Sequence, residues 1–308
     1  MIFWFAKKYL TLLVLALIVV VTFVVASLPA RKPIVVNQKL LDFQGSALPV
    51  LKNATFPVLT SRGVLAIDLD SAVSLYEKEP DAALLPASTT KIMTALIAYD
   101  YYPMNTVLSV SGVKIEGQKM GLSIGEKISV ENLLDGLLIY SANDAAEVLA
   151  GSYPGGRDAF VKAMNLKAKE LHLAKTEFKN PTGLDDYGHR SSARDILHLA
   201  QIAMQNPKLS QIVATENKTV KSVDGGRVHN LRNINELLGK VPGVLGVKTG
   251  WTTEARENLV TYIERDGHKV MIAMLGSQDR FGETKELIEW IFSSYTWTDV
   301  ATLRNTRL

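Results

Sequence analysis

The stretch Pro86-Ala87-Ser88-Thr89-Thr90-Lys91, with the apolar run 92–98 behind it, decides how this chain folds and where its chemistry lies. Pro86 halts the preceding chain, and the run after it predicts a buried helix over residues 89–99. Ser88 and Lys91 stand three residues apart at the helix start, so both side chains lie on one face. A serine hydroxyl becomes a good nucleophile only when a base removes its proton. Burial and the positive end of the helix both favour a lysine with a lowered pKa, which can act as that base.

The same spacing recurs at Ser111 and Lys114, where no helix follows. A serine three residues before a lysine is common on protein surfaces, so the spacing alone does not identify a nucleophile. Pro86 and the apolar helix distinguish Ser88 from Ser111. We therefore predict that Ser88 is the nucleophile and Lys91 its base.

A second motif, Ser141-Ala142-Asn143, falls in the break between two predicted helices. A loop at this position can project a hydroxyl and an amide into a cleft. We expect Ser141 to transfer protons and Asn143 to anchor a substrate, while Asp144 caps the next helix. The alternative is that Asn143 or Asp144 serves only as a helix cap.

The third motif, Lys248-Thr249-Gly250, ends a short apolar strand. Glycine after threonine allows a substrate backbone to lie close to the strand. We expect Lys248 to supply positive charge in the cleft and Thr249 a hydroxyl for a carboxylate. Standing alone, the triplet would also fit an exposed turn.

The remaining pattern predicts strands near both sequence ends and helices between them. Residues 63–76 read as a hairpin, and 259–263 with 270–275 as another with its turn at Asp266-Gly267. Further helices are expected at 130–138 after a Ser129 cap, from 143, at 157–171, at 193–204 and at 283–292, with a strand at 244–248. One α/β domain fits this order: an antiparallel sheet with flanking helices plus an all-helical lobe, and a cleft between the two parts.

Residues 9–29 form an uncharged apolar run that predicts one N-terminal membrane segment. The run is about long enough to cross a bilayer, which takes roughly 20 apolar residues. Small residues at Ala26, Ser27 and Ala30 also allow a cleaved signal peptide. Either reading places the rest of the chain outside the cytoplasm, anchored in the cell membrane or secreted.

Composition excludes several classes of function. The chain holds 34 Lys and Arg against 31 Asp and Glu, and four of the basic residues flank the apolar run: Lys7, Lys8, Arg31 and Lys32. The remainder, with 30 basic and 31 acidic residues, is close to neutral and gives no reason to expect nucleic-acid binding. The chain has no cysteine, so disulfides and a thiolate nucleophile are excluded. The five histidines lack metal-ligand spacing such as H-E-x-x-H, so we expect neither a metal nor a cofactor.

In this order, the three motifs resemble those of the penicillin-binding D-alanyl-D-alanine carboxypeptidases, low-molecular-mass serine peptidases of the bacterial cell wall. The similarity covers roughly residues 55–295. Its supporting stretches are residues 86–91, Gly121-Leu122 with Gly125-Glu126, 141–146, 178–184 (FKNPTGL), 189–195 (HRSSARD) and 246–252.

The resemblance implies a β-lactamase/transpeptidase-like fold, removal of the terminal D-Ala from peptidoglycan stem pentapeptides through an acyl-enzyme on Ser88, and acylation by β-lactams. It also implies that Arg280 helps Thr249 hold the terminal carboxylate, and that the N–H groups of Ser88 and Trp251 form the oxyanion hole. Two departures stand out. Ala255-Arg256 replaces the usual Ala-Gly pair, and residues 292–308 are too short and polar for the β-rich domain and amphipathic helix of many relatives.

These inferences divide the chain into a membrane anchor or signal peptide (1–32), a linker (33–56), the catalytic domain (57–295) and a tail (296–308). Four alternatives were weighed. A D,D-endopeptidase acting on cross-links would use the same machinery. A β-lactamase would need a glutamate setting that Phe178-Lys179-Asn180-Pro181 does not provide. A Ser-His-Asp hydrolase could use Ser123 in Gly121–Gly125, but no strand precedes that motif. A non-enzymatic module should have lost a catalytic side chain.

Overall fold

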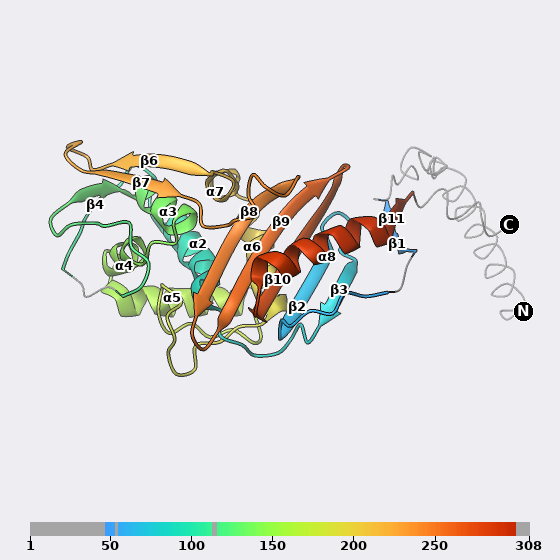
Figure 1. Ribbon diagram of the computed structural model, residues 1–308. Helices are drawn as coiled ribbons and strands as arrows, with labels where there is room; N and C mark the ends of the chain where they lie inside the picture. Colours follow the sequence, from blue (N-terminus) through green and yellow to red (C-terminus); the bar gives the residue numbers. More distant parts are fainter. Residues whose placement is uncertain (1–46, 53–54, 113–115, 300–308) are drawn as a thin grey trace, which may run out of the picture. The chain divides into compact units, whose positions relative to one another are not determined.

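The computed structural model describes residues 47–52, 55–112 and 116–299, and its centre is a five-stranded antiparallel sheet (Figure 1). The strand order is β3 (Ser74–Lys78), β2 (Gly63–Asp68), β10 (His268–Ser277), β9 (Arg256–Arg265) and β8 (Val244–Thr252). Strands β2 and β3 form the N-terminal hairpin that the sequence predicts, and β9 and β10 form the C-terminal one. The two sequence ends therefore meet in one sheet.

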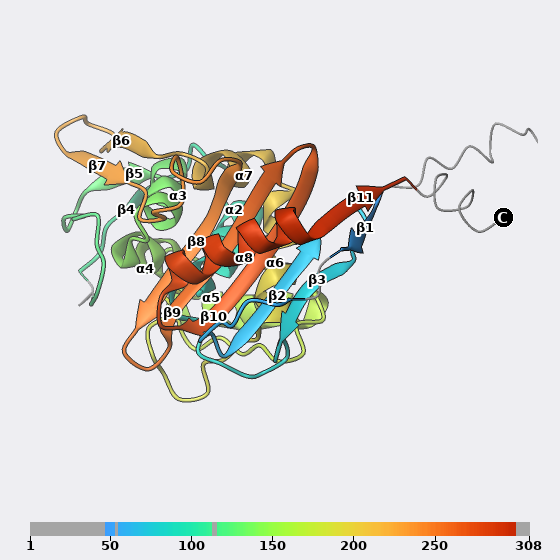
Figure 2. The ribbon, with the colours of Figure 1, turned by 45° about the vertical axis from the view of Figure 1, so that its right-hand side comes forward.

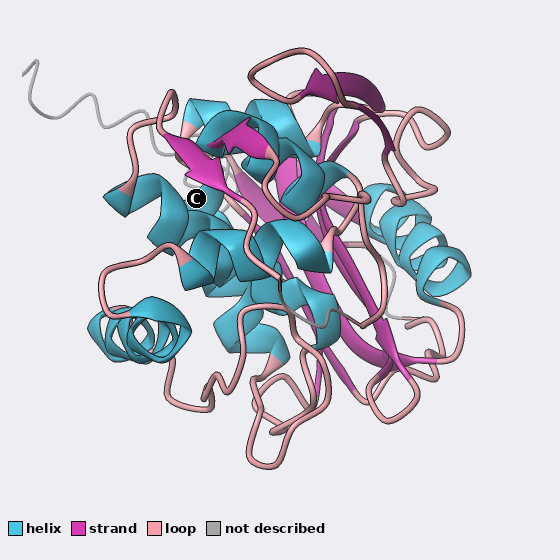
Figure 3. Ribbon diagram, turned by 90° about the vertical axis from the view of Figure 1, so that its left-hand side faces the viewer, coloured by secondary structure: helices cyan, strands magenta, loops and turns pink. Residues whose placement is uncertain are grey.

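Both faces of this sheet are buried, and neighbouring residues of β10 serve opposite faces. Val270, Ile272 and Met274 belong to the core that includes the apolar side of α8 (Arg280–Ser294). Met271, Ala273 and Leu275 belong to the second core, which is shared with the other helices. Because side chains alternate along a strand, cover on both faces makes β10 apolar throughout. Figure 3 shows α8 on one face and the helical lobe on the other.

The helices predicted in the middle of the chain are confirmed. They are α2 (Lys91–Tyr101), α3 (Val130–Ile139), α4 (Asn143–Gly151), α5 (Gly156–Glu170) and α6 (Ala193–Met204). The predicted Ser129 cap is also present, because its hydroxyl accepts a hydrogen bond from the Asn132 N–H at 3.3 Å. A short helix, α7 (Pro207–Val213), was not predicted, although Asn206 caps it and proline occupies its first turn.

Two small sheets beside the lobe were also not predicted (Figure 2). One pairs β4 (Val107–Ser109) with β5 (Lys127–Ser129), and the other pairs β6 (Asn217–Lys221) with β7 (Val228–Arg232). In β6 only Val220 is buried, so the strand offers too little apolar alternation for recognition from sequence.

Ordered structure also extends beyond both predicted domain boundaries. Strand β1 (Leu48–Leu51) lies in the predicted linker and pairs with β11 (Tyr295–Thr298), which enters the predicted tail. No helix within residues 47–52, 55–112 and 116–299 is long and apolar enough to span a membrane. The predicted membrane segment, residues 9–29, lies outside the described residues.

Candidate active site

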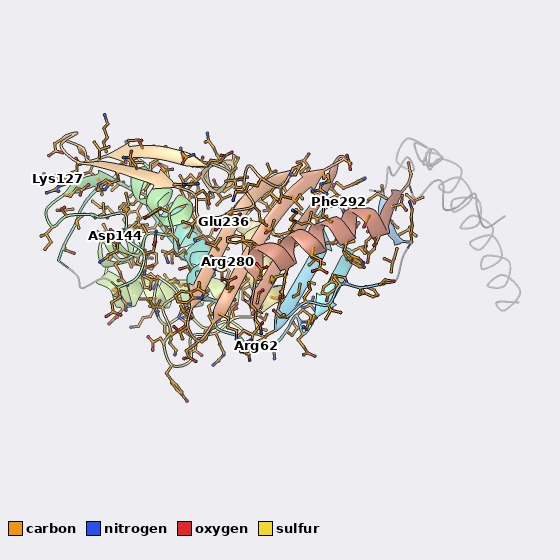
Figure 4. All side chains as sticks on the ribbon, in the orientation of Figure 1. Arg62, Lys127, Asp144, Glu236, Arg280 and Phe292 are labelled. Carbon is orange, nitrogen blue, oxygen red and sulfur yellow. The ribbon has the colours of Figure 1, made fainter. Side chains whose placement is uncertain are left out.

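A cavity of about 1300 Å³ is lined both by the helical lobe and by the β8 edge of the sheet. Figure 4 labels one residue of each part, Asp144 in the lobe and Arg280 at the start of α8. The structure brings most of the predicted site residues to this one cavity. Its lining includes Ser88, Ser141, Asn143, Thr249, Gly250, Trp251 and Arg280. The two predicted lysines, Lys91 and Lys248, are buried behind it.

Ser88 lies in the 3₁₀ turn η2 (Ala87–Thr90) directly before α2. Ala87, the residue before it, has φ of 47°, in the left-handed region that non-glycine residues rarely adopt. The Thr89 hydroxyl donates to the Pro86 carbonyl at 2.6 Å and closes the turn. The sequence therefore builds a tight, locally braced turn that presents the Ser88 hydroxyl to the cavity.

Lys91 occupies the position expected of a base. Its Nζ lies 2.8 Å from Ser88 Oγ and 2.6 Å from the carbonyl oxygen of Thr182, and the side chain is fully buried. Burial lowers the pKa of Lys91 to about 7, although the nearby Glu147 and Asp144 carboxylates act in the opposite direction. In the neutral amine, Nζ can donate to Thr182 and use its lone pair to accept the Ser88 proton.

The segment 180–184 holds this pair in place, and the motif spacing did not identify it. Asn180 Oδ1 accepts hydrogen bonds from the N–H groups of Thr182 and Gly183, which orients the Thr182 carbonyl toward Lys91. Gly183 has φ of +85°, and a Cβ there would lie 1.9 Å from the Ala87 carbonyl oxygen. Only glycine fits so close to the nucleophile turn. The sole sequence signal was the family resemblance of residues 178–184.

The third motif lies within β8 and does not end it, because the strand continues through Thr252. At Gly250 the close neighbour is the nucleophile turn itself, because a Cβ there would lie 2.9 Å from the Ser88 backbone nitrogen; the approach of a substrate backbone stays a prediction. Trp251 follows at the cavity lining with 61% of its surface exposed. Arg256, the first residue of β9, has φ of 59°, a left-handed conformation that favours glycine.

Lys248 and Arg280 differ in how burial affects their positive charge. Lys248 is 1% exposed, and burial, with the positive charges of Lys91 and Arg280, lowers its pKa well below the ordinary lysine value. Arg280 lines the cavity, and its guanidinium donates to the Gly250 carbonyl at 3.3 Å. Because the arginine pKa starts far above neutrality, Arg280 stays charged even though burial lowers it. Arg280 therefore keeps its positive charge in the cavity, while burial favours the neutral form of Lys248.

The second motif differs from its predicted arrangement. Asp144 does not cap α4; its carboxylate accepts hydrogen bonds from the N–H groups of Met120, Gly121 and Leu122 at 2.9–3.0 Å. The Asn143 amide nitrogen donates to the Glu116 carbonyl at 2.6 Å. Among residues 47–52, 55–112 and 116–299, Asn143 Oδ1 has no hydrogen-bond partner. The loop of residues 116–122 therefore binds the Asp144 carboxylate, which was predicted to cap α4, and the Asn143 amide nitrogen, which was predicted to be free for substrate.

Ser141 lines the cavity and has φ of 61°. Of the two serines predicted to be catalytic, Ser141 is thus itself left-handed, and Ser88 follows the left-handed residue Ala87. The rival serine Ser123 lies in the loop between β4 and β5 and does not line the cavity. Ser111 does not line it either, and its partner Lys114 lies outside the described residues. Over residues 47–52, 55–112 and 116–299, no cluster of His, Asp and Glu is arranged to hold a metal ion.

Comparisons with known proteins identify relatives of this arrangement. The family model of the D-alanyl-D-alanine carboxypeptidases, Peptidase S11, matches residues 51–279. A D-alanyl-D-alanine carboxypeptidase of Bacillus subtilis is 32% identical over 76% of this chain, and the chain spans 63% of that protein's length. A D-alanyl-D-alanine endopeptidase of Pseudomonas aeruginosa is 35% identical over 76% of this chain and 77% of its own length.

The fold has solved counterparts. The crystal structure of the Streptomyces K15 DD-transpeptidase superposes with a TM-score of 0.74 and 29% sequence identity. The superposition covers 78% of this chain and all of that protein.

Proposed function

Because this chain belongs to the D-alanyl-D-alanine carboxypeptidase family, we propose that it removes the terminal D-Ala from peptidoglycan stem pentapeptides through an acyl-enzyme on Ser88. The observation that carries the proposal is the pair formed by Ser88 Oγ and the fully buried Lys91 Nζ, 2.8 Å apart. This pair is the nucleophile-and-base arrangement that acyl transfer requires.

Acylation begins when neutral Lys91 accepts the Ser88 proton. With a pKa of about 7, about half of the Lys91 side chains are neutral at pH 7. Ser88 Oγ then attacks the carbonyl carbon of the penultimate D-Ala. The N–H groups of Ser88 and Trp251 stabilise the negative oxygen that develops. The amine of the departing D-Ala takes the proton from Lys91, with the Ser141 hydroxyl in the same cavity as the relay.

Arg280 and Thr249 recognise the free carboxylate of the terminal D-Ala. Both line the cavity, and the planar guanidinium can grip a carboxylate through two hydrogen bonds. The Glu257 side chain holds the start of α8 beside the cavity, because its carboxylate accepts a hydrogen bond from the Arg280 backbone N–H at 2.8 Å. Asn143 Oδ1, which has no partner within the part of the chain that the structure describes, serves as the acceptor for a peptide N–H of the substrate. Water then attacks the acyl-Ser88 ester and releases the tetrapeptide.

The test is D-Ala release from a stem pentapeptide and from the same peptide amidated at its C-terminus. A carboxypeptidase that reads the carboxylate through Arg280 should cleave the free peptide at least about tenfold faster, because a charge-assisted hydrogen bond contributes about 1.5–3 kcal/mol. Equal turnover of the two peptides would remove the carboxypeptidase proposal.

A second candidate is a D,D-endopeptidase that cleaves cross-links between stem peptides. The similarity to the Pseudomonas protein of that name favours it, and the cavity of about 1300 Å³ has room for more than a terminal dipeptide. Equal turnover of free and amidated peptides, together with cleavage of a cross-linked dimer, would support this candidate. Family membership also supports acylation of Ser88 by β-lactams, which resemble the acyl donor.

We further propose that the catalytic domain lies outside the cytoplasm and that residues 9–29 hold it at the cell membrane. The support is the uncharged apolar run in the sequence, together with the location of peptidoglycan substrates. Carbonate extraction of the membrane fraction tests this proposal: release of the full-length chain into the soluble fraction would contradict it.

A further inference from the structure

One wall of the cavity belongs to the connection between β4 and β5, of which residues 116–126, the described part nearest β5, contain no helix or strand. Glu116, Gly117 and Gln118 line the cavity directly. At the end nearest β5, the Gly125 N–H donates to the Val110 carbonyl and the Val110 N–H donates to the Glu126 carbonyl, both at 2.8 Å. Contacts with two elements outside the connection also hold the segment in place.

The first attachment is the start of α4. The Asn143 N–H donates to the Gln118 carbonyl at 2.7 Å, and its side-chain amide donates to the Glu116 carbonyl. Asp144 binds three N–H groups of the same segment, those of residues 120–122. The segment and the Asn143 side chain are therefore coupled, because a shift of one removes the partners of the other.

The second attachment comes from β7 of the neighbouring hairpin. His229 Nδ1 lies 3.1 Å from the Met120 carbonyl oxygen, and Nε2 lies 2.7 Å from Glu126 Oε1. The other Glu126 oxygen accepts the Ser123 N–H at 3.1 Å. His229 and Glu126 are each 6% exposed, and neither lines the cavity. The histidine thus bridges two points of the wall segment from the side away from the substrate.

The two hydrogen bonds of His229 determine how many protons the His229 and Glu126 side chains hold together. The Met120 carbonyl can only accept hydrogen bonds, and so can an ionised Glu126 carboxylate. A neutral imidazole donates from only one ring nitrogen. Both bonds can form only if the pair holds one proton more than a neutral histidine and a carboxylate together. The charged side chains nearby include Arg227, whose Nε lies 3.9 Å from Glu126, and Asp144, which accepts the Gly121 N–H of the same segment.

We propose that His229 and Glu126 are positioning residues: by sharing this proton they clamp the segment 116–126, and through it they hold Asn143 in the geometry that binds the stem peptide. The activity readout of this inference rests on the proposed function. Neither residue touches the reacting atoms, so loss of the clamp acts on substrate binding more than on the chemical step. A merely structural pair would change stability without separating KM from kcat.

Two substitutions distinguish the clamp from ordinary packing. In Glu126→Gln, the side-chain amide donates to an unprotonated Nε2 of His229, while its oxygen still accepts from Ser123. Both bonds of the bridge survive without the extra proton. In His229→Gln, the amide can donate to one acceptor but presents an oxygen to the other. The matched control is His198→Gln, an exposed histidine of α6.

Hydrogen-exchange mass spectrometry on the full-length variants tests the clamp independently of activity. We expect the amides of residues 116–126 to exchange at least about tenfold faster in His229→Gln, and at the wild-type rate in Glu126→Gln and His198→Gln. Unchanged exchange in His229→Gln would overturn the inference whatever the enzyme does. If the same amides exchange as fast in Glu126→Gln as in His229→Gln, the claim that the two side chains share a proton is overturned.

Steady-state kinetics with a stem pentapeptide then tests the link to substrate. His229→Gln should raise KM about tenfold with kcat within about twofold, and Glu126→Gln should stay within about threefold of wild type. If His229→Gln does not fold, Glu126→Met replaces it; this variant removes the partner of Nε2 together with the acceptor of the Ser123 N–H. A wild-type KM in the disrupted variant would overturn the positioning role. If the wild-type protein does not turn over the stem pentapeptide, the proposed function is contradicted. The hydrogen-exchange result alone then decides whether His229 and Glu126 clamp the segment.

Discussion

Replacing Lys91 by methionine is expected to abolish acylation and at the same time to stabilise the folded protein. The native fold lowers the pKa of Lys91 from 10.5 to about 7. Each pKa unit corresponds to about 1.4 kcal/mol of preference for the neutral form, so burying this lysine costs about 4 kcal/mol at pH 7. Methionine fills similar space without that cost. It also loses the bonds to Ser88 and Thr182, together worth about 2 kcal/mol. The net expectation is a gain of about 2 kcal/mol in the free energy of unfolding at pH 7.

The sign of the pH dependence makes this prediction specific. Between pH 7 and 10.5 the unfolded wild-type chain binds a proton at Lys91 that the folded chain does not bind. Wild-type stability should therefore rise with pH across this window. Lys91→Met lacks this contribution, so its advantage should shrink steadily as the pH rises toward 10. Urea unfolding of both proteins at pH 7 and pH 9.5 measures the difference directly. The prediction is refuted if Lys91→Met is less stable than wild type at pH 7 and the stability difference between the two proteins is the same at pH 9.5.

The same proton governs acylation, because only neutral Lys91 can accept the Ser88 proton. The rate constant for acylation by a fluorescent penicillin should fall about tenfold per pH unit below pH 7 and level off above it. A rate that is flat from pH 5 to pH 8 would show that Lys91 is not the base.

Three further predictions concern the site and its attachment. Gly183→Ala should lower the acylation rate about 100-fold, because its Cβ would lie 1.9 Å from the Ala87 carbonyl oxygen; Gly267→Ala, equally left-handed but in open space, is the control and should acylate normally. Arg280→Ala should reduce kcat/KM for a free-carboxylate peptide at least about tenfold, with the amidated peptide nearly unaffected; equal losses would assign Arg280 a structural role. Intact-mass analysis of the membrane-bound protein should give an uncleaved N-terminus, whereas a mature chain that begins near Ser27 or Arg31 would identify a signal peptide.

The sequence predicted the large elements and the chemical motifs because both depend on local patterns. Apolar periodicity identified α2, α3 and α6, and the continuous apolar run of β10 follows from cover on both faces. The nucleophile and its base were predictable because three-residue spacing on one helical turn brings side chains together. Their approach to 2.8 Å is the outcome of that spacing.

Other features depend on contacts between distant segments, which local patterns do not reveal. Asp144 looked like a helix cap, yet it binds N–H groups more than twenty residues earlier in the chain. The burial of Lys248 next to Lys91, which lowers the pKa of Lys248, and the place of Arg280 in the cavity lining also depend on such contacts. The polar strands β6 and β7 were not predicted, because backbone pairing between the two strands holds them and no apolar face marks them in the sequence. The His229–Glu126 pair joins residues 103 positions apart.

The most direct test of the central claim is to trap the acyl-enzyme formed from the peptide substrate itself. The protein is mixed with a stem pentapeptide, quenched in acid and digested, and the modified peptide is located by mass spectrometry. We expect a tetrapeptidyl adduct on Ser88, one released D-Ala for each adduct at early times, and neither product from Ser88→Ala. D-Ala release that persists in Ser88→Ala, or an adduct on Ser111 or Ser123, would contradict this expectation.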